Sequence, residues 1–436
     1  MMQGLTRRIA IAAVAVALMG GCEKTNHENI DKWMGTQNGP DKLAKAMTSG
    51  DLEPDLSAHA AANLIKMGKD TEVRAAIEGL PADRRTLVVA KLTDLLKDLA
   101  RIEGEMTMPS ALQVSAKDVL FDMRKLGDEP TRQAIDAILM DWYTGGYYEG
   151  RASLGRHLGA TVVRVLGAPA GDKLTHAANV IIAQPAKGNV RTKVGDELLL
   201  AMAASGNPES VKYVLDIYHM DRGDPTLAAR CASALYRAYV DPGGLFDVAD
   251  PAALVPSLDR IVEVAQDESQ PPGVTNDAVA LIRAAGMPSC LDPLVRMIPN
   301  PDRQRRWVGA NNALKCGGVK AIAPVAAALA PDSGYDREEL SGAVFEEIAK
   351  MTPRDQVVTE ARTLLDSPSW VSRWIGVEVL ALVKSKEDAP RLSKLAGDKS
   401  KLAGYWGAQE GVDPKAKKVD PTLGARAAEL AAALAK

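Results

Sequence analysis

The histidines of this 436-residue chain are the residues best suited to bind a metal ion or to move protons. There are five of them: His27, His59, His157, His176 and His219. Metal sites usually gather their ligands at short, regular spacings, but no two of these histidines lie within five residues of each other, and no H-E-x-x-H occurs. The sequence therefore predicts no metal site and gives no basis for a cofactor.

Motifs that position a nucleophile or a phosphate group are missing as well. The chain contains no G-x-S-x-G, no P-loop, and no G-x-G-x-x-G that opens a helix after a strand. Paired acids such as Glu338-Glu339 and Glu346-Glu347 are more typical of solvated helix faces than of general acids. We therefore predict that the chain is not an enzyme, although catalytic triads depend on geometry and not on order along the chain.

Aromatic side chains gather in one stretch and could bind a partner. Aromatic residues make up only 4% of the chain, yet four of them fall within seven positions: Trp142, Tyr143, Tyr147 and Tyr148. Tryptophan and tyrosine are enriched at binding hot spots, and the two adjacent glycines between them would let a loop bend. We predict a partner-binding loop here; the alternative is that these rings fill a gap between two irregular repeats.

A cluster of positive charge is the second candidate for partner binding. Arg303, Arg305 and Arg306 stand in the first turn of a predicted helix. The helix dipole disfavours exposed cations there by about 0.3–1 kcal/mol each, so an acidic ligand or a phosphate head group could offset that cost. The alternative is that Arg306 pairs with Asp302 and that the other two arginines are solvated.

A cysteine directly follows an apolar N-terminal run. Arg7 and Arg8 precede eleven apolar residues from Ile9 to Met19, which lead into Gly20-Gly21-Cys22. At ~1.5 Å per residue this run is too short to cross the ~30 Å hydrocarbon core of a membrane. Its length is typical of the apolar region of a secretory signal.

Residues 1–21 with Cys22 resemble a bacterial lipoprotein signal peptide. The resemblance implies that residues 1–21 are removed and that Cys22 is diacylated. Residues 22–39 are then expected to form a lipidated tether on the periplasmic side of the cell envelope. Glu23 follows the cysteine in place of the aspartate associated with inner-membrane retention, which favours the outer membrane. The alternative is an ordinary secretory signal in which the cysteine occurs by chance.

The other three cysteines are expected to have structural roles. Cys231 lies among alanines and leucines of an apolar helix and is expected to be buried. Cys290 begins one predicted helix, and Cys316 ends another one repeat later. Such turns lie on the same edge of a repeat protein, and exported proteins meet an oxidising compartment. We therefore propose a disulfide between Cys290 and Cys316.

A repeat of about 33 residues organises the C-terminal part of the chain. Arg306-Trp307-Val308-Gly309-Ala310 returns as Arg373-Trp374-Ile375-Gly376-Val377. Related segments place further glycines at 342 and 407, so that the four glycines are 33, 34 and 31 residues apart. Because glycine costs ~1 kcal/mol in a helix relative to alanine, its recurrence predicts close approach of a neighbouring helix. Shorter apolar helices and polar breaks separate these segments, and alternating strand patterns are nearly absent.

This repeat resembles HEAT repeats, especially the short bacterial kind found in phycobilisome-lyase-like proteins. Residues 302–329 and 367–395 carry the resemblance best. It implies an all-α fold, a right-handed α-α superhelix, over residues 40–436. Irregular insertions are expected near 142–157 and 240–252, and the helix after Asp420 is expected to cover the last unit.

Composition and architecture together suggest a function. A formal charge of −3 excludes a globally basic nucleic-acid binder. We expect a membrane-anchored, non-catalytic scaffold that binds envelope proteins along its helical surface, with no cofactor and no nucleic acid. Two alternatives stay open: a protein that assists an enzyme or handles a chromophore or cofactor, and a protein that binds envelope glycans through exposed aromatic rings.

Overall fold

The computed structural model describes residues 24–104, 107–144, 148–183, 194–220, 226–329, 340–402 and 422–436. Within these ranges the chain is all α, and no β-strand forms. An isolated antiparallel bridge joins Lys401 and Thr422. By their contacts the residues form two compact units, Met1–Ala201 and Met202–Lys436.

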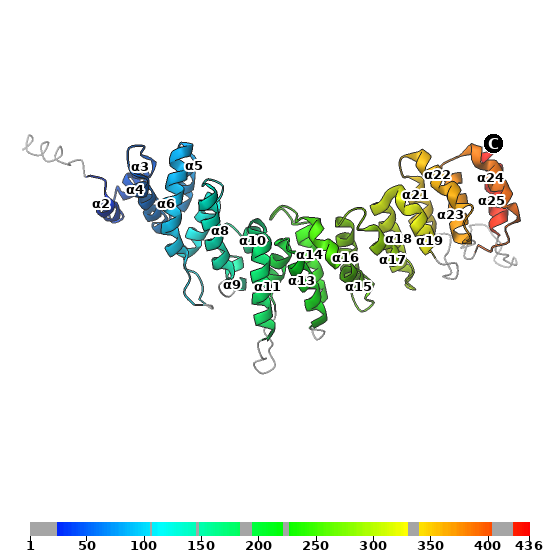
Figure 1. Ribbon diagram of the computed structural model, residues 1–436, viewed down its shortest axis with the longest axis horizontal. Coiled ribbons are helices and arrows are strands. Elements are labelled where there is room, and N and C mark those ends of the chain that lie inside the picture. Colours follow the sequence, from blue (N-terminus) through cyan, green and yellow to red (C-terminus); the bar gives the residue numbers. More distant parts are fainter. Residues whose placement is uncertain are drawn as a thin grey trace, which may run out of the picture. The chain divides into compact units, whose positions relative to one another are not determined.

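Successive helices of the first unit lie side by side in chain order (Figure 1). They are α2 (His27–Trp33), α3 (Gly39–Thr48), α4 (Pro54–Lys66), α5 (Asp70–Glu78), α6 (Ala82–Ala100), α7 (Ala111–Met123), α8 (Glu129–Thr144), α9 (Tyr148–Ala152), α10 (Gly159–Leu166) and α11 (Ala168–Ala183). Helix α12 (Asp196–Ala204) contains the boundary between the units. Helix α4 packs on α3 and α6, and α6 packs on α7 and α8.

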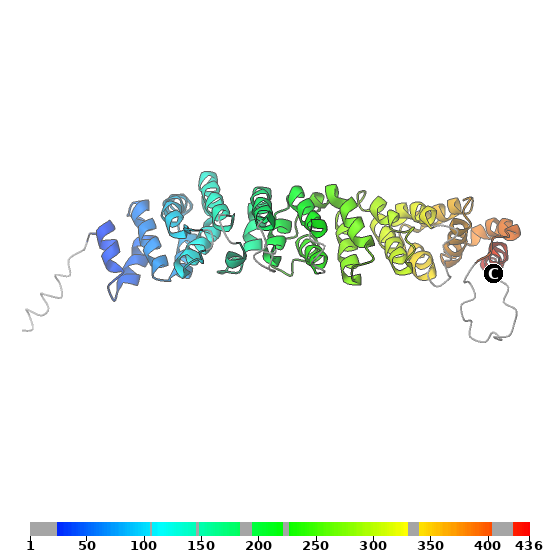
Figure 2. The same ribbon diagram turned by 90° about the horizontal axis from the view of Figure 1, so that it is seen from below.

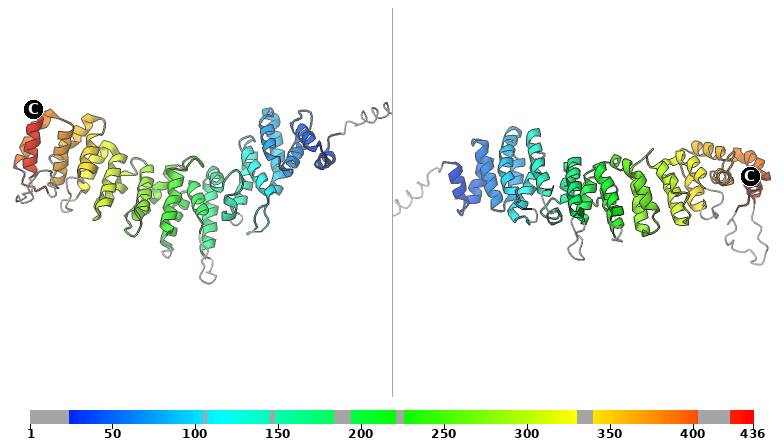
Figure 3. Two further views of the ribbon diagram at one scale, coloured as in Figure 1. Left: turned by 180° about the vertical axis from the view of Figure 1, so that it is seen from behind. Right: turned by 60° about the horizontal axis from the view of Figure 1, so that its bottom comes forward.

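The second unit follows the same pattern, which can be traced by colour in Figures 2 and 3. Its first half comprises α13 (Pro208–Met220), α14 (Leu227–Tyr239), η1 (Pro251–Ser257), α15 (Leu258–Gln266), α16 (Pro272–Ala284), α17 (Leu291–Arg296) and α18 (Arg303–Gly317). Its second half comprises η2 (Gly318–Ala321), α19 (Ile322–Ala328), η3 (Ser341–Phe345), α21 (Glu346–Ala349), α22 (Arg354–Leu364), α23 (Trp370–Leu382), η4 (Lys386–Asp388), α24 (Ala389–Lys394), η5 (Leu395–Gly397) and α25 (Leu423–Leu434).

This packing between chain neighbours is that of an α-solenoid, so the predicted fold class is confirmed. The helix pairs α15 and α16, α17 and α18, α22 and α23, and α24 and α25 pack against each other. Short polar side chains cap the first turn of some of these helices. Asp302 accepts from the backbone N–H of Arg305, and Ser369 accepts from that of Ser372. Each cap satisfies an N–H that has no partner within its own helix.

Glycines do mark close helix contacts. A Cβ built on Gly309 of α18 would lie 2.9 Å from Met297 Cβ, just after α17. A Cβ on Gly376 of α23 would lie 2.7 Å from the backbone oxygen of Ala361 in α22. The prediction from the repeat is thus confirmed at these two positions. The side-chain surroundings of residue 342, and residue 407 as a whole, lie outside what the structure describes.

The predicted N-terminal tether is too long. Residues 27–33 of the segment 22–39 form helix α2, which packs on α3 and α4. Ile30 and Trp33 are buried in that contact. Two apolar side chains one turn apart are enough to dock a short helix, because burying each one is favourable by ~1.5–3 kcal/mol. The insertion near 240–252 does form a loop, in which Gly243 and Gly244 have positive φ, and it leads into η1.

Candidate functional site

The aromatic stretch predicted as a binding loop is buried in the first unit. Trp142 is 3% exposed, Tyr143 0% and Tyr148 3%, while Tyr147 lies outside the described residues. The rings of Trp142 and Tyr143 are 4.9 Å apart in an edge-on contact. The prediction that Trp142, Tyr143 and Tyr148 form a surface for partners is therefore wrong. They fill the space where the irregular helices α8 and α9 meet, as the alternative proposed.

The charged residue that these rings surround is Lys117 of α7. Its side chain is fully buried, and its Nζ lies 5.4 Å from the ring centre of Trp142 and 5.9 Å from that of Tyr143. Nζ pairs with Asp118 Oδ1 at 2.6 Å and donates to the carbonyl oxygens of Leu154 and His157 at 2.9 and 2.8 Å. Burial lowers the pKa of Lys117, although the pairing with Asp118 opposes this shift.

Two aspartates of α7 complete a polar cluster around the segment 153–158. Asp118 accepts from the backbone N–H groups of Arg156 and His157 at 2.7 and 3.3 Å. One turn later, Asp122 accepts from Arg156 Nη2 at 2.8 Å, and His157 Nε2 lies 2.7 Å from its Oδ1. Arg74 Nη1 lies 3.4 Å from the same carboxylate. The two acids lie four residues apart, so they share one face of the helix.

The contacts of this cluster hold the backbone of the segment 153–158 in place. All three hydrogens of the Lys117 ammonium have acceptors, and its cation faces two aromatic rings, so the charge is compensated without water. The aspartates use their oxygens to hold backbone N–H groups, arginine and histidine. The cluster therefore secures an irregular connection that has no helix of its own. No sequence pattern links its members, because they come from α5, α7 and the segment 153–158.

Two of the three arginines in the basic cluster on α18 bind backbone carbonyl oxygens. Arg306 is buried, and its Nη1 donates to the carbonyl oxygens of Asn300 and Pro301 at 3.1 and 3.4 Å. Arg305 donates to the carbonyl oxygens of Gln266 and Asp267, which end α15. These two arginines satisfy backbone oxygens of preceding turns, which corrects their predicted role in partner binding. Arg303 is exposed, and its role stays a prediction.

Trp307 is a surface residue, although its helical spacing would favour burial. It shares one face of α18 with Ala310 and Leu314, which are 2% and 1% exposed, yet it is itself 40% exposed. Its counterpart one double repeat later, Trp374, is 0% exposed, and its Nε1 donates to Glu378 at 3.1 Å. The ring of Phe345 in η3 lies 5.3 Å from that of Trp374. Side chains of neighbouring elements therefore decide whether the tryptophan at this position of the repeat is covered.

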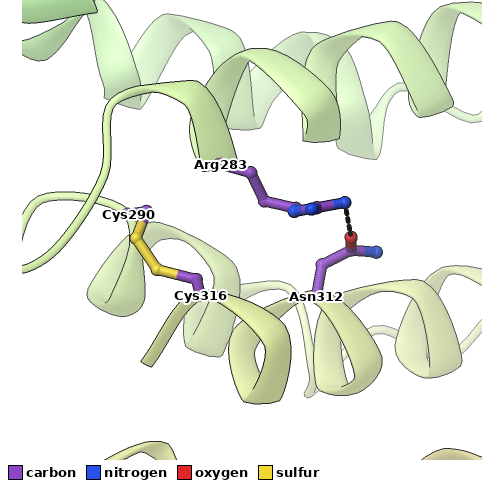
Figure 4. The surroundings of a disulfide bond; sticks show 4 residues. All are labelled: Arg283, Cys290, Asn312 and Cys316. Atoms are coloured by element: carbon purple, nitrogen blue, oxygen red, sulfur yellow. Dashed lines mark hydrogen bonds between the residues drawn. A yellow bond between two sulfur atoms is a disulfide. The ribbon is translucent and has the colours of Figure 1, made fainter. Parts of the chain in front are cut away.

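A disulfide joins Cys290 and Cys316, and Figure 4 shows its surroundings. Cys290 precedes α17 and Cys316 lies in the last turn of α18, with their Cα atoms 6.5 Å apart. The start of the first helix and the end of the second meet because the two helices form a hairpin. Nearby, Arg283 of α16 donates to Asn312 of α18 at 3.4 Å. The predicted disulfide is confirmed, and Cys231 is buried as expected.

Several predictions concern residues that the structure does not describe. Residues 1–21 and the lipidation site Cys22 lie outside the described residues. In the described part of the chain, no helix is both long and apolar enough to cross a membrane. The same residues contain no group of three or more histidine, cysteine, aspartate or glutamate side chains that could hold a metal ion.

Comparisons with known proteins give matches among solved structures only. No family model matches the chain, and no curated protein matches it. The chain is similar to human deoxyhypusine hydroxylase in complex with glycerol, at 20% identity and a TM-score of 0.24, over 69% of this chain and 98% of that one. It is also similar to an engineered protein, at 16% identity and a TM-score of 0.29, over 91% of this chain and 98% of that one.

These matches correct one prediction. We predicted from the absence of catalytic motifs that the chain is not an enzyme. Deoxyhypusine hydroxylase, one of the matched proteins, is an enzyme, so this prediction is not upheld. Identities of 20% and 16% concern the fold alone, and nothing of the hydroxylase's activity is carried to this chain.

Proposed function

We propose that this chain is a lipid-anchored α-solenoid that binds protein partners in the bacterial cell envelope. The observation that carries the proposal is the exposed indole of Trp307 on α18. Stacked helices offer long surfaces for binding, and tryptophan is the residue type most enriched at the energetic centre of protein interfaces. Arg303 lies exposed one turn earlier on the same helix, and arginine is also enriched at the energetic centres of interfaces.

Two features of the chain support a location in the cell envelope. Cys22 follows an apolar run and two glycines, and the Cys290–Cys316 disulfide suits an oxidising compartment. Two acyl chains on Cys22 would hold the protein stably, because each buried CH₂ contributes ~0.8 kcal/mol. With Glu23 after the cysteine, we place the protein at the outer membrane, facing the periplasm.

Metabolic labelling tests the anchor. Cells that express the full chain are fed radiolabelled palmitate, and the protein is recovered from membranes. We expect label in the native chain and none in the Cys22→Ala variant, which should leave the membrane fraction. A buried cysteine, changed as Cys231→Ala, is the matched control and should keep the label. An unlabelled native chain would contradict the anchor but not the partner-binding surface.

Cross-linking in intact cells tests the surface. A photoreactive amino acid replaces Trp307 or, as the control, Lys315, an exposed residue of the same helix. We expect a discrete protein adduct from position 307 and none from 315, and we expect Trp307→Ala to weaken capture of that partner at least tenfold. Equal adducts at both positions, or none at 307, would contradict the proposal. Retained glycan or bound pigment would favour one of the other functions considered above.

A further inference from the structure

Two histidines from different helices face each other in the first unit. His27 is the first residue of α2, and His59 lies within α4. Their Nδ1 atoms are 2.7 Å apart, and their ring centres are 5.0 Å apart. They are separated by 32 positions in the chain, so no local spacing pattern could have linked them.

The other nitrogen of each ring is bound to a carboxylate. His27 Nε2 lies 3.2 Å from Asp55 Oδ2, and His59 Nε2 lies 2.8 Å from Asp31 Oδ1. An ionised carboxylate only accepts, so each Nε2 carries a hydrogen and each neutral ring has its lone pair on Nδ1. Two lone pairs 2.7 Å apart repel each other unless a positively charged species lies between them.

The carboxylate behind His59 is itself held in place. Asn63 is fully buried and donates from Nδ2 to Asp31 Oδ1 at 2.9 Å, and Lys66 Nζ donates to Asn63 Oδ1 at 3.1 Å. A ring N–H held by a fixed carboxylate is the arrangement found behind histidines that ligate metal ions.

We propose that His27 and His59 bind one divalent transition-metal ion through their Nδ1 atoms, with water in the remaining positions. A cation fits the charge of the site, because Asp31 and Asp55 bring two negative charges next to the two rings. The His27 side chain is 57% exposed, so water can reach the ion.

The geometry requires only a small adjustment. Metal–nitrogen bonds of ~2.0–2.1 Å at tetrahedral angles place the two nitrogens about 3.3 Å apart. The rings must therefore separate by roughly half an ångström, which the exposed His27 on its seven-residue helix can provide. Because the protein supplies only two ligands, binding should be much weaker than at a four-ligand zinc site. Copper should bind more tightly than nickel or zinc.

Calorimetric titration tests the site. The full-length chain, purified in detergent without a polyhistidine tag, is titrated with CuCl₂, NiCl₂ and ZnCl₂. We expect one site per chain, at least tenfold weaker binding in His27→Ala and in His59→Ala, and no change in His176→Ala, which removes an exposed histidine of α11. Asp31→Asn should weaken binding about ten- to hundredfold, since it loosens the hold on His59.

Electron paramagnetic resonance of the copper-loaded chain identifies the ligands. The native chain should show coupling to two imidazole nitrogens, and each single variant should show coupling to one. If no saturable binding occurs up to millimolar metal, the proposal is wrong and a shared proton joins the rings. Binding that persists unchanged in the double variant His27→Ala/His59→Ala would equally overturn it, because the metal would then sit elsewhere.

Discussion

Single residues decide how closely the helices of this protein approach and what they can enclose. At Gly376 an added methyl group would meet a backbone oxygen at 2.7 Å and Leu365 Cδ2 at 3.0 Å. Backbone cannot move aside as a flexible side chain does, so α23 and α22 would have to separate. At Gly273, in the first turn of α16, nothing lies within 4 Å of the same methyl group.

These two glycines give a matched pair of substitutions. Gly376→Ala should lower the free energy of unfolding by about 1–3 kcal/mol, because the core there is overpacked. Gly273→Ala should raise it by about 0.4–1 kcal/mol, because alanine restricts the unfolded chain without a clash. Urea unfolding followed by circular dichroism measures both changes. Equal effects of the two substitutions would show that helix contact at Gly376 is looser than described.

Lys117 shows how a buried charge serves this fold. Lys117→Met removes the cation that pairs with Asp118, a residue that is only 3% exposed. Breaking such a pair costs about 3–5 kcal/mol, because one charge is left uncompensated. Lys125→Met, at an exposed site two residues beyond α7, is the control and should be nearly neutral. If the thermal unfolding midpoints of the two variants coincide, Lys117 contributes less to stability than we expect.

At the scale of helices, ion pairs tie the C-terminal hairpins together. Arg362 of α22 reaches Asp388 at the end of η4 at 2.8 Å, and Arg426 of α25 reaches Glu378 of α23 at 2.7 Å. Asp388 is almost completely buried, and burial opposes its ionisation. Hydrogen bonds from Arg362 and Ser385 nevertheless outweigh burial, so the pKa of Asp388 lies below its usual value.

Stability at this contact should depend on pH in one direction. Because the pKa of Asp388 is lowered by folding, its contribution is complete above about pH 4 and is lost as pH falls through the folded-state pKa. Asp388→Asn should therefore cost about 1.5–3 kcal/mol at pH 7 and less at pH 3. Exposed Asp366→Asn serves as the control, and the measurement is urea unfolding at both pH values. A cost independent of pH would mean that Asp388 acts by shape alone.

Across the whole molecule, stability should be local. Each helix packs mainly on its neighbours in the chain, so a change in one hairpin is felt by the adjoining helices and fades beyond them. The Cys290–Cys316 disulfide closes a loop with a sequence separation of 26 residues. A cross-link of that length contributes roughly 3–4 kcal/mol.

Reduction of that disulfide tests this locality by hydrogen exchange. We expect amide exchange in α17 and α18 to accelerate at least tenfold, exchange in α16 and α19 to rise less, and exchange in α4 to α8 to stay unchanged. The Cys290→Ala/Cys316→Ala variant should exchange like the reduced chain and should no longer respond to reductant. Faster exchange in the first unit would show that the units unfold together.

Much of the fold followed from the sequence, because it depends on neighbours in the chain. Helical periodicity, polar breaks between the helices, and glycines placed one repeat apart predicted the helical hairpins. They also predicted the edge on which Cys290 and Cys316 meet. In a solenoid each helix packs on the next, so these local signals also specify most of the tertiary contacts.

The tertiary structure alone decided what is buried and which distant side chains meet. Trp142 and Tyr143 look like recognition residues in the sequence but surround Lys117, while Trp307 looks like core and is exposed. His27 and His59, 32 positions apart, carry no mutual signal until α2 docks on α4. The reason is physical: periodicity gives each helix an apolar stripe, but the rotation of that helix against its neighbours depends on how all their side chains fill space.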